Sequence, residues 1–390
     1  MNCSQKKVIA QILPSLESGG VERGVVDIAK EVKNRGFESI VISNGGTMTY
    51  LLKEAGIKHI TLDVKTKNPF KIYRNIKKIR KLINEFHIDL IHVRSRAPMI
   101  SAYFACKTTN TKIVTTVHGN YSLGLLKCKN FAPKRFYNSI MLKSDAIIAV
   151  SEFIKNYIIE NYQKHSKQDL TQKTTVITRG VDLKYFNPSS IFIGRTIDLA
   201  KKWGLPEDKK IILFPARITA WKGHEFLIES LKKVKSDFVC IFVGSDHGHK
   251  KFRKKLQEKI IAQNLSQQIK FVGTCKEMPV AYELANLVIS ASVKPEAFGR
   301  IAIEAQAMKK IIIATNIGGS LETIIDKKTG FLTENENTDM MAEIIDKALT
   351  MPISESDKIR ENARIHVEEN FSNQKMYQKT IEVYNFVLKI

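Results

Sequence analysis

Short apolar runs typical of buried β-strands alternate with stretches of helical spacing along the first half of the sequence. These runs are KVIAQIL (7–13), SIVIS (39–43), HITL (59–62), DLIHV (89–93), KIVTTV (112–117), AIIAV (146–150) and TVITR (175–179). The stretches between them, such as VERGVVDIAKEVKNRG, place apolar residues three and four positions apart, as amphipathic helices do. Strands that are apolar throughout and separated by helices favour parallel βαβ units with both faces covered. This half is predicted to form an open, doubly wound α/β sheet.

The alternation restarts after an irregular segment around Pro188, which is typical of an interdomain linker. The second set of strands is KIILFPAR (210–217), DFVCIFVG (237–244), IKFVG (269–273), ANLVISAS (285–292) and KIIIAT (310–315). From about Ser354 to Ile390 the spacing is helical. A chain of 390 residues also exceeds what one core usually serves. The sequence therefore predicts two facing Rossmann-like domains, residues 1–188 and 189–370, and a C-terminal helix at 371–390 that returns to the first.

The composition is that of a folded globular protein, with 43% hydrophobic and 26% charged residues. Gln11 interrupts the first apolar run and no small-residue cleavage site follows it, which favours a strand over a signal peptide. No apolar stretch approaches the roughly 18 residues of a spanning helix. The cysteines are odd in number, scattered and without metal-ligand spacing, namely Cys3, Cys106, Cys128, Cys240 and Cys275. Reduced thiols in the cytoplasm are expected, with Cys240 a buried hydrophobe.

The net charge of +23 is large enough to attract anionic partners. Nucleic acid, anionic lipid and a sugar nucleotide are the candidates, and a biased base composition of the gene would raise the lysine content without any binding role. The basic residues are dispersed, and there is no helix-turn-helix, zinc or RNP-type pattern. No nucleic-acid partner is expected.

Ligands of doubly wound sheets bind where strands end, because helix N-termini there offer N–H groups and partial positive charge to anions. The first strand is followed by PSLESGG (14–20), in which Gly19 and Gly20 either let the backbone approach a phosphate or serve a tight turn. This loop is neither a GxGxxG fingerprint nor a P-loop. His118 follows the strand 112–117, where it either hydrogen-bonds a ligand or has a structural role.

Two cations, Arg217 and Lys222, share the loop ARITAWKG (216–223) between a strand and a helix. One is a planar donor and the other a point charge, a combination that suits a diphosphate leaving group whose charge grows as a glycosidic bond breaks. In a chain with 62 lysines and arginines such a pair also arises by chance.

The most specific motif is PEAFGRIAIEA (295–305), which follows the strand 285–292. Gly299 at the start of a helix would direct N–H groups toward a phosphate. Glu304, one turn further, can accept hydrogen bonds from ribose hydroxyls, and Glu296 in the preceding loop would lie near a donor sugar. Two glutamates at this spacing are common by accident, so the strand, loop and helix around them carry the signal. The candidate substrate-binding residues of the motif are Phe298, Gly299, Arg300 and Glu304.

This motif resembles the signature of the GT-B glycosyltransferases of the fourth carbohydrate-active family (glycosyl transferases group 1), in which seven residues separate two glutamates. The similarity extends over nearly the whole chain, and it includes Gly19-Gly20, His118, Arg217 with Lys222, RGVD (179–182), YFNP (185–188), IGGSLE (317–322) and TGFL (329–332). The sequence departs from the family at Lys309-Lys310, where a glycine usually precedes a proline. The family pattern therefore does not predict the turn from helix to strand there.

The resemblance implies a role for each charged residue of the second domain, the nucleotide-sugar donor side. Arg217 and Lys222 would hold the diphosphate, Glu304 the ribose and Glu296 the donor sugar. The catalytic residues that it implies are His118, Glu296, Arg217 and Lys222.

In the first domain, the acceptor side, the resemblance implies that His118 lies near the reacting centre. It also implies that Gly20 closes over the phosphates of the donor. Three segments resemble a narrower group, the bacterial lipopolysaccharide-core transferases, which are often mannosyltransferases. These segments are RSRAP (94–98), TTVHG (115–119) and FYNS (136–139). The implied acceptor is a lipid-linked glycan or a lipopolysaccharide core in cell-envelope biosynthesis.

By this resemblance the protein is a retaining, metal-independent hexosyltransferase whose donor is a nucleotide diphosphate sugar, with UDP and GDP both open. No cofactor and no metal are implied, and no DxD-type motif follows a strand. A sugar-nucleotide epimerase of the same fold would use the same donor site without an acceptor and is the first alternative. A basic protein that binds nucleic acid through its net charge is the second.

A basic stretch at 65–81 has an apolar stripe formed by Ile72, Ile76 and Ile79. A basic amphipathic helix is typical of elements that bind an anionic membrane surface. The competing interpretation is a solvated helix whose isoleucines pack on the sheet. The first predicts a protein that is peripheral on the inner face of the cytoplasmic membrane.

Overall fold

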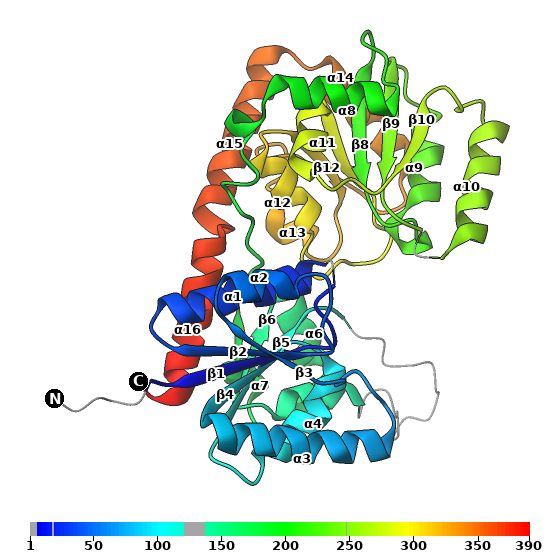
Figure 1. Ribbon diagram of the computed structural model, residues 1–390. Coiled ribbons are helices and arrows are strands. Elements are labelled where there is room, and N and C mark those ends of the chain that lie inside the picture. Colours follow the sequence, from blue (N-terminus) through cyan, green and yellow to red (C-terminus); the bar gives the residue numbers. More distant parts are fainter. Residues whose placement is uncertain (1–5, 18, 121–136, 247) are drawn as a thin grey trace. The chain divides into compact units, whose positions relative to one another are not determined.

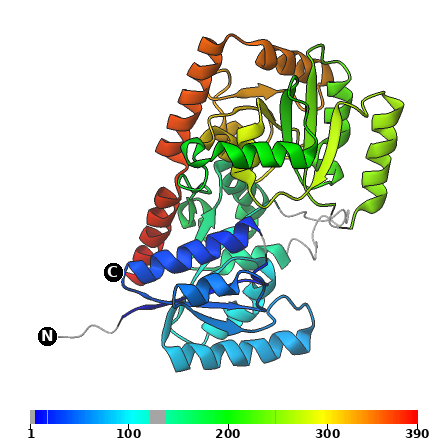
Figure 2. The same cartoon turned by 45° about the horizontal axis from the view of Figure 1, so that its top comes forward.

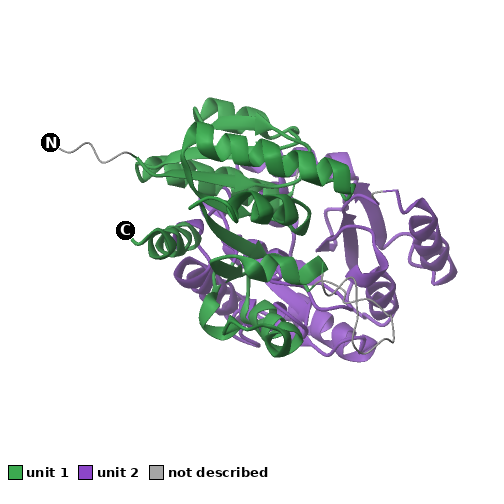
Figure 3. Ribbon diagram, turned by 90° about the horizontal axis from the view of Figure 1, so that it is seen from below, with its two compact units in different colours: residues 1–178, 376–390 green, residues 179–375 purple. Residues whose placement is uncertain are grey.

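The computed structural model describes residues 6–17, 19–120, 137–246 and 248–390. The chain divides into two compact units, coloured in Figure 3. Unit 1 runs to Thr178 and resumes at Met376, and unit 2 spans Arg179–Lys375. Unit 2 thus begins before the predicted boundary at 188, because Val181 forms a parallel bridge with Ser372.

The described part of unit 1 contains a parallel sheet of seven strands in the order β3-β2-β1-β4-β5-β6-β7 (Figure 1). The strands are β1 (Val8–Ile12), β2 (Glu38–Ser43), β3 (Lys58–Thr61), β4 (Ile88–Val93), β5 (Lys112–Val117), β6 (Ala146–Ala149) and β7 (Thr174–Val176). All neighbouring pairs are parallel. The predicted doubly wound sheet is confirmed.

Helices cover both faces of this sheet (Figure 1, Figure 2). The helices of unit 1 are α1 (Gly20–Asn34), α2 (Thr49–Glu54), α3 (Pro69–Phe86), α4 (Arg96–Cys106), α6 (Glu152–Tyr162), α7 (Leu170–Lys173), the short helices η1 (Ile140–Lys143) and η2 (Gln163–His165), and most of α16 (Asn373–Leu388). The buried side of α16 contributes Ile381 and Tyr384 to a core cluster with Ile9 of β1 and Leu90 of β4. The C-terminal helix is therefore part of the core of unit 1.

A hydrogen-bonded network of buried polar side chains lies in the core of unit 1. His92 of β4 is fully buried, with Tyr384 Oη 2.5 Å from its Nδ1 and Thr116 Oγ1 2.7 Å from its Nε2. Burial and the neighbouring Arg94 lower the pKa of His92 well below its usual value, so the ring is neutral. The network fixes α16 against β4 and β5.

Unit 2 repeats the architecture, with six parallel strands in its described part in the order β10-β9-β8-β11-β12-β13. Its strands are β8 (Lys210–Pro215), β9 (Phe238–Val243), β10 (Ile269–Gly273), β11 (Leu287–Ser290), β12 (Ile311–Thr315) and β13 (Phe331–Thr333). Its helices are η3 (Pro188–Ser190), α8 (Ile193–Trp203), η4 (Ala220–Lys222), α9 (His224–Leu231), α10 (Lys250–Ala262), α11 (Met278–Leu284), α12 (Arg300–Ala307), α13 (Ser320–Thr323), α14 (Thr338–Thr350) and α15 (Ile353–Asn370). The predicted second Rossmann-like sheet and the helical C-terminal stretch are confirmed.

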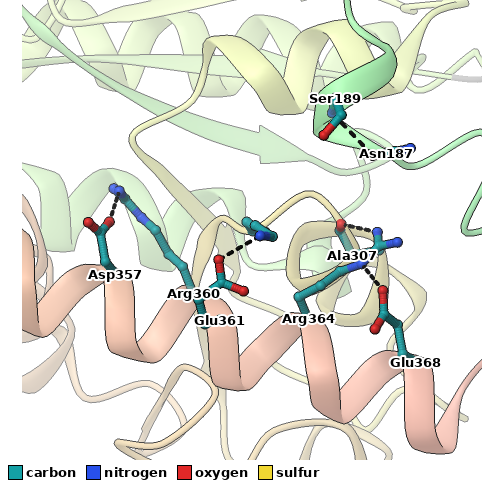
Figure 4. Close-up of polar contacts among 9 residues, drawn as sticks. Asn187, Ser189, Ala307, Asp357, Arg360, Glu361, Arg364 and Glu368 are labelled. Carbon is teal, nitrogen blue, oxygen red and sulfur yellow. Dashed lines mark hydrogen bonds and ion pairs between the residues drawn. The ribbon is translucent and has the colours of Figure 1, made fainter.

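Helix α15 is fixed to the end of α12 by one arginine (Figure 4). Nη1 of Arg364 donates to the carbonyl oxygens of Ala307, at 2.6 Å, and of Phe186, at 2.8 Å. Ala307 is the last residue of α12, whose carbonyls have no partner within the helix. Arg364 thereby satisfies a carbonyl group at this buried helix end and holds α12 in place.

Helix α3 corrects one expectation from the sequence. Its apolar stripe packs into the core of unit 1, where Ile79 is fully buried and Ile76 lies against the same cluster. The stripe is therefore not the face that could meet a membrane, and the competing interpretation is confirmed for these isoleucines. The exposed side of α3 instead carries its lysines together with Phe70, which is 80% exposed, and Tyr73.

The described cysteines are unpaired thiols. Cys240 is fully buried in β9, as predicted, and burial strongly raises its pKa. Cys3, Cys128 and Phe136 lie outside the described residues. Within the described chain, no helix combines the length and apolarity needed to cross a bilayer.

Candidate functional site

The loop after β8 and the loop after β11 meet at the carboxyl edge of the unit 2 sheet. Gly223 ends the first loop in the left-handed region, with φ +78°, and a Cβ there would lie 1.7 Å from the carbonyl oxygen of Ala291. The backbone N–H of Val293 also donates to the Trp221 oxygen at 2.9 Å. Only glycine at 223 permits this approach, which brings Lys222 to the second loop.

Lys222 and Glu296 form a largely buried ion pair, with Nζ 2.6 Å from Oε1 and side chains that are 9% and 14% exposed. The hydroxyl of Ser292 donates to the same Oε1, and the Lys222 ammonium lies 4.4 Å from the centre of the Trp221 ring. Among the described residues, none hydrogen-bonds Oε2 of Glu296. One carboxylate oxygen is thus held by the protein and the other is available to a ligand.

Two consecutive glycines fix the backbone of Glu296. Gly319 donates its N–H to the Glu296 carbonyl oxygen at 2.9 Å, and Gly318 pairs with Glu296 in a parallel bridge. A Cβ at Gly319 would lie 2.3 Å from Cα of Phe298. This contact explains why the IGGSLE segment, far along the sequence, belongs to the same site.

Glu304 is oriented by two donors. Tyr282 donates its hydroxyl to Oε2 at 3.0 Å, and Arg300 donates from Nη2 to Oε1 at 2.7 Å. Burial and the charge of Glu304 hold the pKa of the Tyr282 hydroxyl well above its usual value, so this hydroxyl keeps its proton and donates. Each carboxylate oxygen still has a lone pair for another donor.

The remaining sequence-predicted residues of unit 2 have different surroundings. Gly299 adopts φ +83° and precedes α12, and no side chain caps that helix. Phe298 is 3% exposed and packs edge-on against Phe371, with 5.6 Å between ring centres. Little of the Phe298 ring is accessible to a ligand. A contact between this ring and a substrate stays a prediction. Arg217 is exposed two residues after the end of β8, and no described side chain forms an ion pair with it.

The three predicted residues of unit 1 lie at the carboxyl edge of its own sheet. Gly19 and Gly20 begin α1 after β1, and His118 follows β5. Gly46, after β2, packs on the same loop, since its Cβ would lie 2.5 Å from the backbone carbon of Leu16. The structure thus joins Lys222 to Glu296 and Arg300 to Glu304 within unit 2. A contact of the unit 1 residues with the same ligand stays a prediction.

Two supporting residues escaped the sequence analysis. Ser292 and Tyr282 hold the two glutamates from other segments. No local pattern singles out such residues, because their role depends on contacts between distant parts of the chain. Among the described residues, no group of three or more histidine, cysteine or carboxylate side chains is placed to hold a metal ion. Metal independence itself stays a prediction.

Comparisons with known proteins place these motifs in a family. A model described as glycosyl transferases group 1 matches residues 196–366, and one described as glycosyltransferase family 4 matches residues 18–185. A crystal structure of a glycosyltransferase from Rickettsia africae ESF-5 is 41% identical, with 98% of this chain and 99% of that chain covered and a TM-score of 0.89. The chain belongs to the group 1 glycosyltransferases.

Two further relatives of this glycosyltransferase are informative. The capsular polysaccharide biosynthesis glycosyltransferase CapM of Staphylococcus aureus is 26% identical over 90% of both chains. The structure of HepE from Anabaena in complex with UDP-glucose has a TM-score of 0.81 at 21% identity, covering 97% of this chain and 99% of that chain. At that identity the likeness to HepE shows the GT-B fold alone.

The glycosyltransferase should lose stability on mild acidification through His224, the first residue of α9. His224 is fully buried beside Phe214 and Phe242, and burial lowers its pKa to about 4. Its stabilising contribution is complete above the unfolded pKa of about 6.5 and is lost as the pH falls toward 4. Between pH 7.5 and pH 5 the loss is about 2 kcal/mol.

Urea unfolding at the two pH values measures this effect. In His224→Phe the loss between pH 7.5 and pH 5 should be smaller than in wild type by about 2 kcal/mol. His165→Phe, at an exposed histidine, is the matched control and should behave as wild type. Equal pH dependence in all three proteins would contradict the assignment.

Proposed function

We propose that this glycosyltransferase transfers a hexosyl group from a nucleotide diphosphate sugar, with retention of anomeric configuration and without a metal ion, to an acceptor of cell-envelope glycan synthesis. The observation that carries the proposal is the carboxylate of Glu296. Lys222 and Ser292 occupy its Oε1, and no described residue hydrogen-bonds Oε2. A carboxylate fixed in this way suits a sugar hydroxyl, which needs one rigid acceptor.

In this proposal the departing diphosphate is stabilised by charge that is already in place. When the glycosidic bond breaks, its electron pair goes to a phosphate oxygen, and the new charge is met by Arg217, Lys222 and the N–H groups at the start of α12. Removing one such preorganised donor typically lowers kcat by about a hundredfold to a thousandfold. Lys222 serves twice, because the same ammonium holds Glu296.

Glu304 is the proposed partner of the ribose. Its two oxygens are oriented by Tyr282 and Arg300, so the carboxylate is held in one position before a ligand arrives. A preoriented acceptor loses little conformational entropy when it binds a pair of vicinal hydroxyls. The UDP-glucose bound to HepE supports a nucleotide sugar as donor and makes UDP the first nucleotide to examine.

The proposed acceptor is a lipid-linked glycan or a lipopolysaccharide core, reached from the inner face of the cytoplasmic membrane. The name of CapM, which assigns that relative to capsular polysaccharide biosynthesis, supports an envelope glycan. A mannosyl group is the donor sugar suggested by the narrower resemblance in the sequence. The exposed lysines of α3, with Phe70 and Tyr73 beside them, are the proposed contact with anionic lipid.

Thermal unfolding of the full chain with UDP, GDP and ADP tests the donor site. A nucleotide at a hundred times its Kd should stabilise the folded wild type by about 2.7 kcal/mol. Arg217→Ala should weaken that nucleotide by roughly tenfold to a hundredfold, since it removes a charge-assisted hydrogen bond of about 1.5–3 kcal/mol. The matched control is Lys358→Ala, which removes an exposed cation of α15.

Either of two results would contradict this donor assignment. In the first, none of the three nucleotides shifts the unfolding temperature of the folded wild type. In the second, the two variants respond to the nucleotide alike. Because Arg217 is exposed, its replacement should leave the unfolding temperature without nucleotide unchanged.

Vesicle sedimentation tests the membrane contact. Binding to vesicles of phosphatidylglycerol should exceed binding to phosphatidylcholine. A triple variant of α3, K77Q/K78Q/K81Q, should lose about 3 kcal/mol of the free energy of binding to the anionic vesicles, at about 1 kcal/mol per lysine. The variant K250Q/K251Q/K254Q of α10 makes the same change in net charge and should retain the binding. Equal losses in the two variants would contradict a specific role of α3.

A further inference from the structure

The segment YFNP (185–188) of unit 2 contains two neighbouring aromatic residues with different exposure. Phe186 is buried, whereas Tyr185 is 49% exposed. The two rings meet edge to face, with 5.1 Å between their centres. A single exposed aromatic side chain is common on protein surfaces. The position of Tyr185 therefore has to decide whether its ring has a role.

A row of aromatic rings connects Tyr185 to the proposed ribose site. The Phe186 ring lies edge to face against Tyr282, with 6.0 Å between ring centres, and the Tyr282 hydroxyl donates to Oε2 of Glu304 at 3.0 Å. Burial and the neighbouring Glu277 raise the pKa of the Tyr185 hydroxyl, and the charge of Glu304 adds a smaller contribution. Tyr185 thus lies within electrostatic range of the carboxylate that is proposed to bind the ribose.

The Tyr185 ring is held in one orientation. The Asp182 carboxylate accepts from the N–H of Tyr185 at 3.1 Å, and the Asp182 carbonyl oxygen accepts from the N–H of Phe186 at 2.8 Å. At the far end of the ring, the Tyr185 hydroxyl donates to the carbonyl oxygen of Lys276 at 3.3 Å. Lys276 lies in the loop between β10 and α11. Because both ends of the residue are fixed, the ring loses little conformational entropy when a ligand packs on it.

The loop that holds the Tyr185 hydroxyl belongs to the same sheet edge as Arg217. Gly244, directly after β9, donates its N–H to the Gly273 carbonyl oxygen at 2.7 Å. A Cβ at Gly244 would lie 2.0 Å from the carbonyl oxygen of Ala216, so this glycine packs on the loop after β8. The chain segments that follow β8, β9 and β10 are therefore in contact one after another. A ligand bound at Arg217 can extend along this edge toward Tyr185.

We propose that Tyr185 binds the base of the donor nucleotide by stacking its ring on the face of the base. The inference rests on the proposed function, in which Glu304 binds the ribose. The base is bonded to the ribose carbon beside the vicinal hydroxyls, so a ribose held by Glu304 keeps its base close by. The donor sugar is at the other end of the diphosphate, near Glu296. Every nucleobase has an aromatic face, so the contact adds affinity without selecting one base.

Thermal unfolding of the full chain tests the role of Tyr185, with UDP, GDP and ADP as nucleotides and pyrophosphate as a probe without base or ribose. In Tyr185→Ala the affinity for the nucleotide that the wild type binds should fall roughly fivefold to a hundredfold, as is typical for one stacked base. The affinity for pyrophosphate should not change. Tyr185→Phe retains the ring and should restore most of the nucleotide affinity. The matched control is Phe386→Ala, which removes an 82% exposed ring of α16 and should respond as wild type.

The variant Arg217→Ala separates a failure of this inference from a failure of the donor proposal. Arg217 would contact the diphosphate, so its loss should weaken the binding of the nucleotide and of pyrophosphate alike. A nucleotide whose binding depends on Arg217 but is unchanged in Tyr185→Ala would overturn the role of Tyr185 and leave the donor site intact. If no nucleotide binds the folded wild type, both proposals are wrong.

Saturation-transfer NMR distinguishes a direct contact with the base from an indirect effect through Glu304. Saturation of the aromatic protons of the wild type should attenuate the base protons of UDP more than its ribose protons. Tyr185→Leu keeps an apolar side chain without the ring, so this preference should be lost when the UDP concentration is raised to compensate for weaker binding. The same preference in Tyr185→Leu and wild type would contradict a base stacked on Tyr185.

Discussion

The ion pair between Lys222 and Glu296 is the contact on which the donor half of this glycosyltransferase depends. Both side chains are largely buried, so each charge is stable there only because the other lies 2.6 Å away. The pair forms because Gly223 lets one loop touch Ala291 and because Gly318 and Gly319 hold the backbone of the other. Three glycines that contact no ligand in the proposed site thus determine where its two charges lie. Loss of either charge would leave its partner buried and unpaired, at a cost of roughly 3–5 kcal/mol.

Helix N-termini without a side-chain cap occur at the carboxyl edge of both sheets. Helices that start at the carboxyl ends of parallel strands expose N–H groups toward that edge, and α1, α4, α9 and α12 all begin there without a side-chain cap. By contrast, α3 is capped by Asn68, which accepts from the N–H groups of Phe70 and Lys71. An uncapped helix N-terminus is an unused donor group in a free protein, and it becomes useful when an anion binds. In unit 2 that anion is the proposed diphosphate.

Much of the fold was predictable because the strands are long, apolar and regularly spaced. The strand β13 was missed, since three residues at the edge of a sheet are too short to show a pattern. The stripe on α3 was visible, but the sequence could not say whether core or membrane covers it, because that depends on which helix packs on which face. Glu296 and Glu304 were found through their motif. Tyr282, Ser292 and the burial of Arg94 were not, since these follow from contacts between segments distant in sequence.

Hydrogen–deuterium exchange of the full chain with and without UDP tests the central claim most directly, because it locates the ligand on the chain without a variant. The account predicts slower exchange in two segments of unit 2, the loop 216–223 and the start of α12 from Gly299, with Glu296 between them. The C-terminal halves of α10 and α14, which lead to the opposite edge of the sheet, should exchange at unchanged rates. Protection that is absent from both predicted segments while UDP stabilises the protein would contradict the account, since the nucleotide would then bind elsewhere.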